Sequence, residues 1–272
     1  MIDFIMKRLL LLSIVICNFL HITKAQNSQD IIKCATDQYM SEMMKNNPDF
    51  LKEYQELNQN VYKDLSDSTI GNKSQTTIIV PTVVHVIHIN GSGNISDAQV
   101  IDGLNIINND LQRLNADTGD TRSIFQGVAG SMDIELRLAR KDPNGDCTNG
   151  IVRVNSPLTN QAGNNVKALS YWPSDQYFNI WLVNTIFNFT GGQGIILGYA
   201  QFPGNNASLT YGVVNRNDRW GSIGSASDDG RTATHEVGHC FNLYHTFQSG
   251  CGPLTGSCLG QGDEVCDTPP VA

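Results

Sequence analysis

The 272-residue sequence contains few charged residues, and fewer basic than acidic ones. Its 18 Lys and Arg against 26 Asp and Glu give a net charge of -8, which argues against nucleic acid and an anionic membrane surface as partners. The chain lacks an apolar run long enough to cross a bilayer, which excludes stable membrane insertion. With 40% hydrophobic residues, it can instead bury one good-sized core.

The first residues have the pattern of an export signal. Lys7-Arg8 precede the apolar run Leu9 to Leu20, and Thr23-Lys24-Ala25 offers small residues at the two positions that a signal peptidase inspects. A membrane anchor is the alternative, but a spanning helix needs about 20 apolar residues, more than this run supplies. We therefore predict a signal peptide over residues 1–25 and a secreted, extracellular protein.

Export has a consequence for the cysteines, because an oxidising compartment favours disulfide bonds. Six cysteines lie outside the signal, and the sequence leaves their pairing open. They are Cys34, Cys147, Cys240, Cys251, Cys258 and Cys266.

The stretch from Thr234 to His245 holds three of the six histidines of the chain. His235 and His239 are four residues apart, so on a helix both imidazoles project from one face and can reach one ion. A continued helix would carry His245 roughly 15 Å beyond His235, too far to share that ion. The helix must therefore end first, and Asn242 is the expected place because Asn readily adopts the left-handed conformation that closes a helix.

Three histidine ligands leave the fourth position of a zinc ion open, which is typical of a catalytic site. Zinc lowers the pKa of a water molecule there towards about 7, and Glu236, beside the first ligand, is the candidate general base. The motif predicts a secreted zinc-dependent endopeptidase that hydrolyses peptide bonds of protein or peptide substrates. Two alternatives stay open: a peptidase with Glu264 as its third ligand, and a catalytically inactive zinc-binding or adhesion module.

The same stretch resembles a known family. His235 to His245 is similar to the metzincin pattern HExxHxxGxxH, with Asn242 in place of Gly. The longer run from Arg231 through Gln248 to Thr268-Pro269 resembles the pappalysin (cytophagalysin, M43) zinc metallopeptidases. This resemblance implies a metzincin-like α+β fold, in which helices back a twisted, mostly parallel mixed sheet with one antiparallel edge strand.

The resemblance also implies roles for particular residues. Leu197 to Gln201 would form the edge strand that borders the cleft and receives a bound peptide. A calcium ion would be held by Asp263, Thr268 and the Cys266 carbonyl, since hard oxygen ligands suit that ion. The alternative for these last three positions is a cystine-stapled turn without an ion.

Apolar and β-branched runs predict the strands, and one amphipathic pattern predicts a helix that backs the sheet. Ser96 is expected to cap that helix, and Ser227-Asp228-Asp229 to cap the helix of the histidines, which begins near Gly230. The predicted strands are Thr77–Ile89, Met132–Leu138, Tyr177–Asn184, Ile195–Phe202 and Tyr211–Asn215.

Residues 26–76 have the composition of a propeptide, and residues 77–272 are the predicted catalytic domain. Cys34 is a candidate latency residue, because a thiolate from a pro-segment can take the open position of the zinc. Cys34-Ala35-Thr36 is similar to the segment that opens many bacterial pappalysin-like precursors. A disulfide or a buried thiol is the alternative for Cys34, and Asp37 is a carboxylate that could fill the latency role.

The last methionine is Met132, whereas metzincins carry a methionine-containing turn beneath the zinc. Family resemblance would also pair Cys251 with a cysteine downstream of Pro270. Without Cys34 an odd number of cysteines remains, and an odd number in a secreted protein implies a missing partner. We therefore expect the catalytic domain to be C-terminally incomplete, with its C-terminal subdomain missing.

Overall fold

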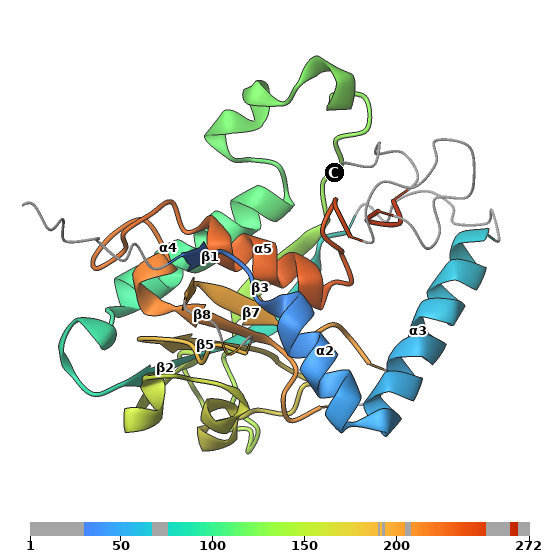
Figure 1. Cartoon of the computed structure of the whole chain (residues 1–272). Coiled ribbons are helices and arrows are strands. Elements are labelled where there is room, and N and C mark those ends of the chain that lie inside the picture. Colours follow the sequence, from blue (N-terminus) through green and yellow to red (C-terminus); the bar gives the residue numbers. More distant parts are fainter. Residues whose placement is uncertain are drawn as a thin grey trace, which may run out of the picture. The chain divides into compact units, whose positions relative to one another are not determined.

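The computed structural model describes residues 30–66, 76–189, 191, 194–204, 208–248 and 262–265 (Figure 1). The predicted signal peptide lies outside these residues. The described residues from Ile31 onward belong to one compact unit. Within the described ranges, no helix is both long and apolar enough to cross a membrane.

A six-stranded sheet forms the centre of the fold, in the order β3-β2-β5-β8-β7, with β4 also paired to β2. All pairs are parallel except β7 with β8. This confirms the predicted α+β fold with a mostly parallel mixed sheet and one antiparallel edge strand. The strands are β2 (Ile78–His88), β3 (Ile134–Leu138), β4 (Ile151–Asn155), β5 (Phe178–Val183), β7 (Gly198–Ala200) and β8 (Val213–Arg216).

The long strand β2 pairs with three other strands of the sheet. Its first half pairs with β3 and its second half with β4, while β5 runs along its other side. The run Val83–Ile87 is buried throughout, as expected for a parallel strand that is covered on both faces. The sequence predicted β2 but missed β4, whose short alternating run gives a weak signal.

Alternating side chains of β5 divide the interior into two cores. Ile180 and Leu182 point into one core, and Trp181 and Val183 into the other, because successive side chains of a strand face opposite ways. Helices α4 (Asp97–Leu111) and α5 (Arg231–Cys240) cover the first core on one side of the sheet (Figure 1). Ser96 caps α4 as predicted, accepting a hydrogen bond from the backbone N–H of Gln99.

The segment predicted to be a propeptide contributes to the second core. Its strand β1 (Ile31–Ile32) pairs in parallel with β6 (Ile195–Ile196), and helices α2 (Thr36–Asn46) and α3 (Pro48–Ser66) follow. Tyr39, Met40 and Phe50 are buried there with side chains of the sheet. Short 3-10 turns complete the fold: η1 (Gly91–Gly93), η2 (Ala116–Asp120), η3 (Ser123–Phe125), η4 (Pro157–Thr159), η5 (Asn164–Leu169) and η6 (Asn217–Arg219).

Two local predictions need correction. The strand predicted over Ile195–Phe202 is divided at Leu197, because the pairing partner changes there from β1 to β8. The N–H of Leu197 donates to the Ile32 carbonyl, and its carbonyl accepts from the N–H of Arg216. The N-cap of α5 is Gly230, whose φ of 77° suits glycine, and not a residue of Ser227-Asp228-Asp229. The carboxylates of Asp228 and Asp229 instead accept from the N–H groups of Gly230 and Arg231, respectively.

Candidate metal centre and catalytic site

The end of α5 brings the third histidine back to the first two. Asn242 has a φ of 66°, the left-handed conformation that was expected of it. The N–H of Asn242 donates to the His239 carbonyl, and the N–H of Leu243 donates to the Gly238 carbonyl, each at 3.0 Å. These two bonds form a Schellman motif, which ends the helix and reverses the chain. His245 can therefore approach His235 although it lies ten residues further on.

Four side chains converge at this point. The Nε2 atom of His235 lies 3.1 Å from the Nε2 atoms of both His239 and His245. The Sγ atom of Cys34 lies 3.4 Å from the Nε2 atom of His239, and all four ligand atoms lie within 4.8 Å of one another. Nitrogen ligands at the corners of a tetrahedron around zinc would be about 3.3 Å apart. The cluster therefore has the size of a tetrahedral zinc site.

The imidazole rings of His239 and His245 are also hydrogen-bonded at Nδ1, the nitrogen that faces away from the cluster, as is usual for histidines that bind a metal. The Nδ1 atom of His239 lies 2.7 Å from the Leu243 carbonyl, and that of His245 lies 3.2 Å from the Asp37 carboxylate. Both oxygens accept, so each Nδ1 carries a proton, and in the neutral ring Nε2 then presents a lone pair to the cluster. The hydrogen bond to Asp37 raises the pKa of His245. Burial lowers the pKa of His239 to about 4, which keeps its ring neutral. Neutral imidazoles are what a metal requires.

Glu236 lies beside the cluster and is fully buried. Burial raises the pKa of its carboxyl to about 8. Its Oε2 atom accepts a 2.8 Å hydrogen bond from the Thr36 hydroxyl, while its Oε1 atom has no hydrogen-bond partner among the described residues. Gly198 of the edge strand makes room for this side chain, since a Cβ atom there would lie 2.8 Å from the Glu236 Cγ atom.

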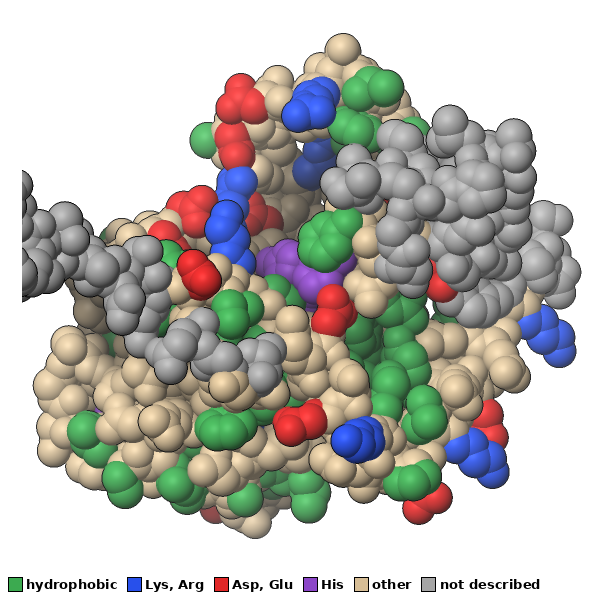
Figure 2. Space-filling view, viewed as in Figure 1, with side chains coloured by type: hydrophobic (Ala, Val, Ile, Leu, Met, Phe, Trp, Pro, Cys, Tyr) green, Lys and Arg blue, Asp and Glu red, His purple; other side chains and the backbone are tan. Residues whose placement is uncertain are grey.

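A pocket gives access to the cluster. Its lining includes Cys34, His235 and His245 together with Arg231 and Phe247. Figure 2 shows the histidine side chains in a hollow of this face, beside a column of Lys and Arg side chains. The pocket therefore connects the cluster to solvent on the side that residues 31–38 border.

Comparisons with known proteins agree with this geometry. A promirolysin mutant of Tannerella forsythia is 36% identical and superposes with a TM-score of 0.66 over 87% of this chain and 75% of that chain. Mature mirolysin of the same organism, in complex with a cleaved peptide, is 38% identical with a TM-score of 0.59, over 72% and 73% of the two chains. The peptidase M43 family, described as pregnancy-associated plasma protein-A, matches residues 160–272. The chain belongs to the M43 metallopeptidases.

Curated relatives carry names of the same kind. Extracellular metalloprotease 1 of Coccidioides posadasii (strain C735) is 48% identical over 84 residues, 28% of this chain and 28% of the relative. An extracellular metalloprotease of Verticillium alfalfae (strain VaMs.102) is 29% identical over 213 residues, 75% of this chain and 62% of the relative. The chain thus spans less than two thirds of the length of these curated relatives.

The alternative third ligand and the predicted calcium site lie apart from the cluster or outside the described part. Glu264 is described but does not belong to the group of Cys34 and the three histidines. The Asp263 carboxylate accepts from the N–H of Val265. Cys266 and Thr268, the other two positions predicted for calcium, lie outside the described residues.

The three described cysteines differ from the prediction that export would oxidise them. Cys34, Cys147 and Cys240 are all free thiols. The disulfide alternative for Cys34 is therefore not formed, and its thiol instead meets the metal cluster. Cys251 and Cys258 lie outside the described residues.

Sequence reasoning missed two residues that touch the candidate base of this M43 protein. Thr36 was named only as part of a similar segment, yet its hydroxyl binds Glu236 across 200 positions of the chain. Gly198 was predicted as part of an edge strand without a role of its own. The available signal for Thr36 was a short polar side chain two residues after Cys34, while for Gly198 no local pattern exists.

Proposed function

We propose that this protein is a secreted zinc-dependent endopeptidase, made as a precursor, that hydrolyses peptide bonds of protein or peptide substrates. The observation that carries the proposal is the convergence of three imidazole nitrogens beside one buried carboxylate. Extracellular names among the relatives support secretion, and the cleaved peptide bound to mirolysin supports peptides as substrates. Zinc-dependent cleavage of casein by the processed protein tests the proposal.

His235, His239 and His245 would hold the metal. A zinc ion, when bound there, supplies Lewis-acid polarisation of the peptide carbonyl and lowers the pKa of water. Glu236 then acts as the general base: it accepts the proton of the attacking water and passes it to the leaving amine.

The edge of the sheet would bind the substrate backbone. The pro-segment already uses this edge: the N–H of Ala35 donates to the Gly198 carbonyl, and the N–H of Leu197 donates to the Ile32 carbonyl, each at 3.1 Å. An extended peptide can make the same kind of backbone bonds as an added strand. We propose that substrates replace the pro-segment along β6 and β7.

Gly198→Ala is expected to lower kcat/KM of the processed enzyme roughly 10–100-fold, because the added methyl group displaces Glu236 from its position. Cleavage of a fluorogenic peptide measures the effect. Gly119→Ala is the matched control, since a Cβ atom there meets nothing within 4 Å. Wild-type kinetics for Gly198→Ala in a folded, zinc-loaded protein would contradict the proposed position of the base.

Residues 26–76 would keep the precursor latent. Cys34 lies at the corner of the cluster that the histidines leave open, and burial raises the pKa of its thiol. A divalent cation reverses that preference and favours the thiolate as a ligand. The Thr36 hydroxyl at the same time engages Glu236. We propose that the pro-segment therefore blocks both the metal and the base until it is removed.

Cys34→Ser is expected to raise the basal peptidase activity of the unprocessed precursor at least about tenfold, since each 1.4 kcal/mol of lost pro-segment binding corresponds to a factor of ten. The assay follows a fluorogenic peptide while a gel confirms that the precursor remains uncut. Cys147→Ser removes an exposed thiol and should leave latency unchanged. A Cys34→Ser precursor as latent as the wild type would show that the thiol is no latch.

A further inference from the structure

A lysine is completely buried in the second core. Lys167 lies in η5 and has no exposed surface. Its Nζ atom donates a 2.6 Å hydrogen bond to the Thr210 carbonyl, and no carboxylate among the described residues forms an ion pair with it. Burial lowers the pKa of Lys167 to about 7. Burial of a cation without an ion pair costs free energy, so other groups around Lys167 must stabilise it.

Three aromatic rings surround this ammonium group. The Nζ atom lies 4.9 Å from the ring centroid of Tyr39, 5.0 Å from that of Tyr199 and 5.6 Å from that of Trp181. Distances within about 6 Å allow the ring faces to attract a cation. Two of the rings belong to the sheet, whereas Tyr39 belongs to the pro-segment. The cage is therefore complete only while the pro-segment is bound.

The hydroxyl group of Tyr39 is bound as specifically as its ring. It donates a 3.0 Å hydrogen bond to the Asn164 Oδ1 atom, lies 3.4 Å from the Gln201 Oε1 atom and accepts from Lys167 at 3.4 Å. Its ring packs against Tyr199 and Phe189, with centroids 4.6 and 5.5 Å apart. A phenylalanine at position 39 would keep the ring contacts but leave the amide oxygen and the lysine without these partners.

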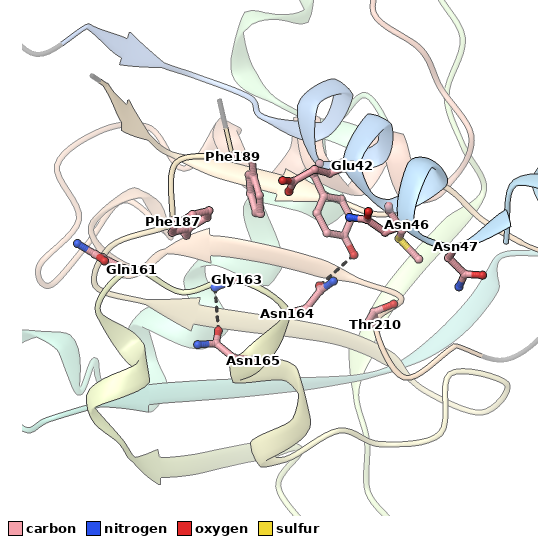
Figure 3. Close-up of a pocket in the computed structure, with 12 residues that line it drawn as sticks. Glu42, Asn46, Asn47, Gln161, Gly163, Asn164, Asn165, Phe187, Phe189 and Thr210 are labelled. Atoms are coloured by element: carbon pink, nitrogen blue, oxygen red, sulfur yellow. Dashed lines mark hydrogen bonds between the residues drawn. The ribbon is translucent and has the colours of Figure 1, made fainter. Parts of the chain in front are cut away.

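One wall of the pocket next to this ring belongs to the pro-segment and would be lost when that segment is removed. Glu42 and Asn46 of α2 form that wall, while Asn164, Phe189 and Thr210 line the other side (Figure 3). Removal of α2 opens the space that Tyr39 fills and joins it to this pocket. The remaining walls come from the predicted catalytic domain.

We propose that Lys167, Asn164, Tyr199 and Phe189 form a pocket that binds a tyrosine side chain of a bound peptide. Tyr39 fills it in the precursor, and after processing it receives a tyrosine of another peptide. The inference rests on the proposed removal of residues 26–76. It is separate from the metal cluster, because Asn164, Lys167 and the aromatic rings touch none of the metal-binding histidines.

Peptide binding to the processed protein tests the pocket. The probe is a synthetic peptide of residues 30–47 with serine in place of Cys34, made with either tyrosine or phenylalanine at position 39. We expect the tyrosine peptide to bind about tenfold more tightly, through its hydroxyl contacts. Lys167→Met should reduce this ratio at least threefold, and Lys141→Met, which alters an exposed lysine, should not change it. Thermal unfolding monitored by circular dichroism verifies that both variants are folded.

Equal affinity of the two peptides for the wild-type protein would overturn the pocket, and so would an unchanged ratio in folded Lys167→Met. The outcome is independent of catalysis. A tyrosine preference in a protein without zinc-dependent activity would sustain the pocket and refute the proposed function. Zinc-dependent activity without a tyrosine preference would do the reverse.

Discussion

Glu236→Gln is expected to lower kcat/KM of the processed enzyme by about 10²–10⁴-fold, the usual contribution of a general base. Glutamine keeps the shape of the side chain but cannot accept the proton of the attacking water. Glutamine fits the same space beside Gly198, and Glu236 is not among the four side chains that offer ligand atoms to the cluster. Zinc content should therefore stay at the wild-type value while turnover of a fluorogenic peptide falls.

Glu135→Gln is the matched control, since Glu135 lies on β3 and pairs with Arg137 away from the cluster. Near-wild-type cleavage by zinc-loaded Glu236→Gln would refute the assignment of Glu236 as the base. A wild-type protein that holds zinc but cleaves nothing after processing would instead support the inactive binding module. Both results come from the same assay.

His245→Ala is expected to weaken zinc binding more than about 100-fold, because it removes one of three protein ligands and even changes in the groups that orient ligands cost 10–100-fold. Peptidase activity should fall with the metal. The competing ligand set replaces His245 with Glu264. If the three histidines are the ligands, Glu264→Ala should keep both zinc and activity. Zinc measured by atomic absorption after dialysis against a buffered zinc concentration compares the two variants.

Loss of zinc only in Glu264→Ala would establish the other ligand set and contradict the present one. His85→Asn offers a further comparison. His85 is buried, stacks on Trp181 and binds Asn179, so its replacement disturbs the core without touching the cluster. Zinc retained in His85→Asn but lost in His245→Ala would separate metal ligation from general damage to the fold.

Local sequence patterns were sufficient to predict the helix and the turn that position the histidines. The four-residue spacing of His235 and His239 requires only helix geometry, and the turn at Asn242 follows from the few residues that tolerate a positive φ. Strand β2 was predicted because its β-branched run is long. The edge strand came from family resemblance, and the structure confirms it as antiparallel.

The remaining features depend on contacts between distant positions. Thr36 and Glu236 are 200 positions apart, and Tyr39 and Lys167 are 128 positions apart. Hydrophobic periodicity is read within one segment at a time. From such a pattern a lysine such as Lys167 is expected at the surface. The break at Leu197 has the same origin, since that residue bonds both to β1 and to β8.

The metal content of the processed protein tests the central claim most directly. The account predicts one equivalent of zinc per chain, loss of casein cleavage on treatment with a chelator, and recovery when zinc is restored. The reading must be taken after residues 26–76 have been removed, so that Cys34 contributes no ligand. A folded, processed protein that carries no transition metal, or that cleaves casein equally well in the presence of the chelator, would contradict it.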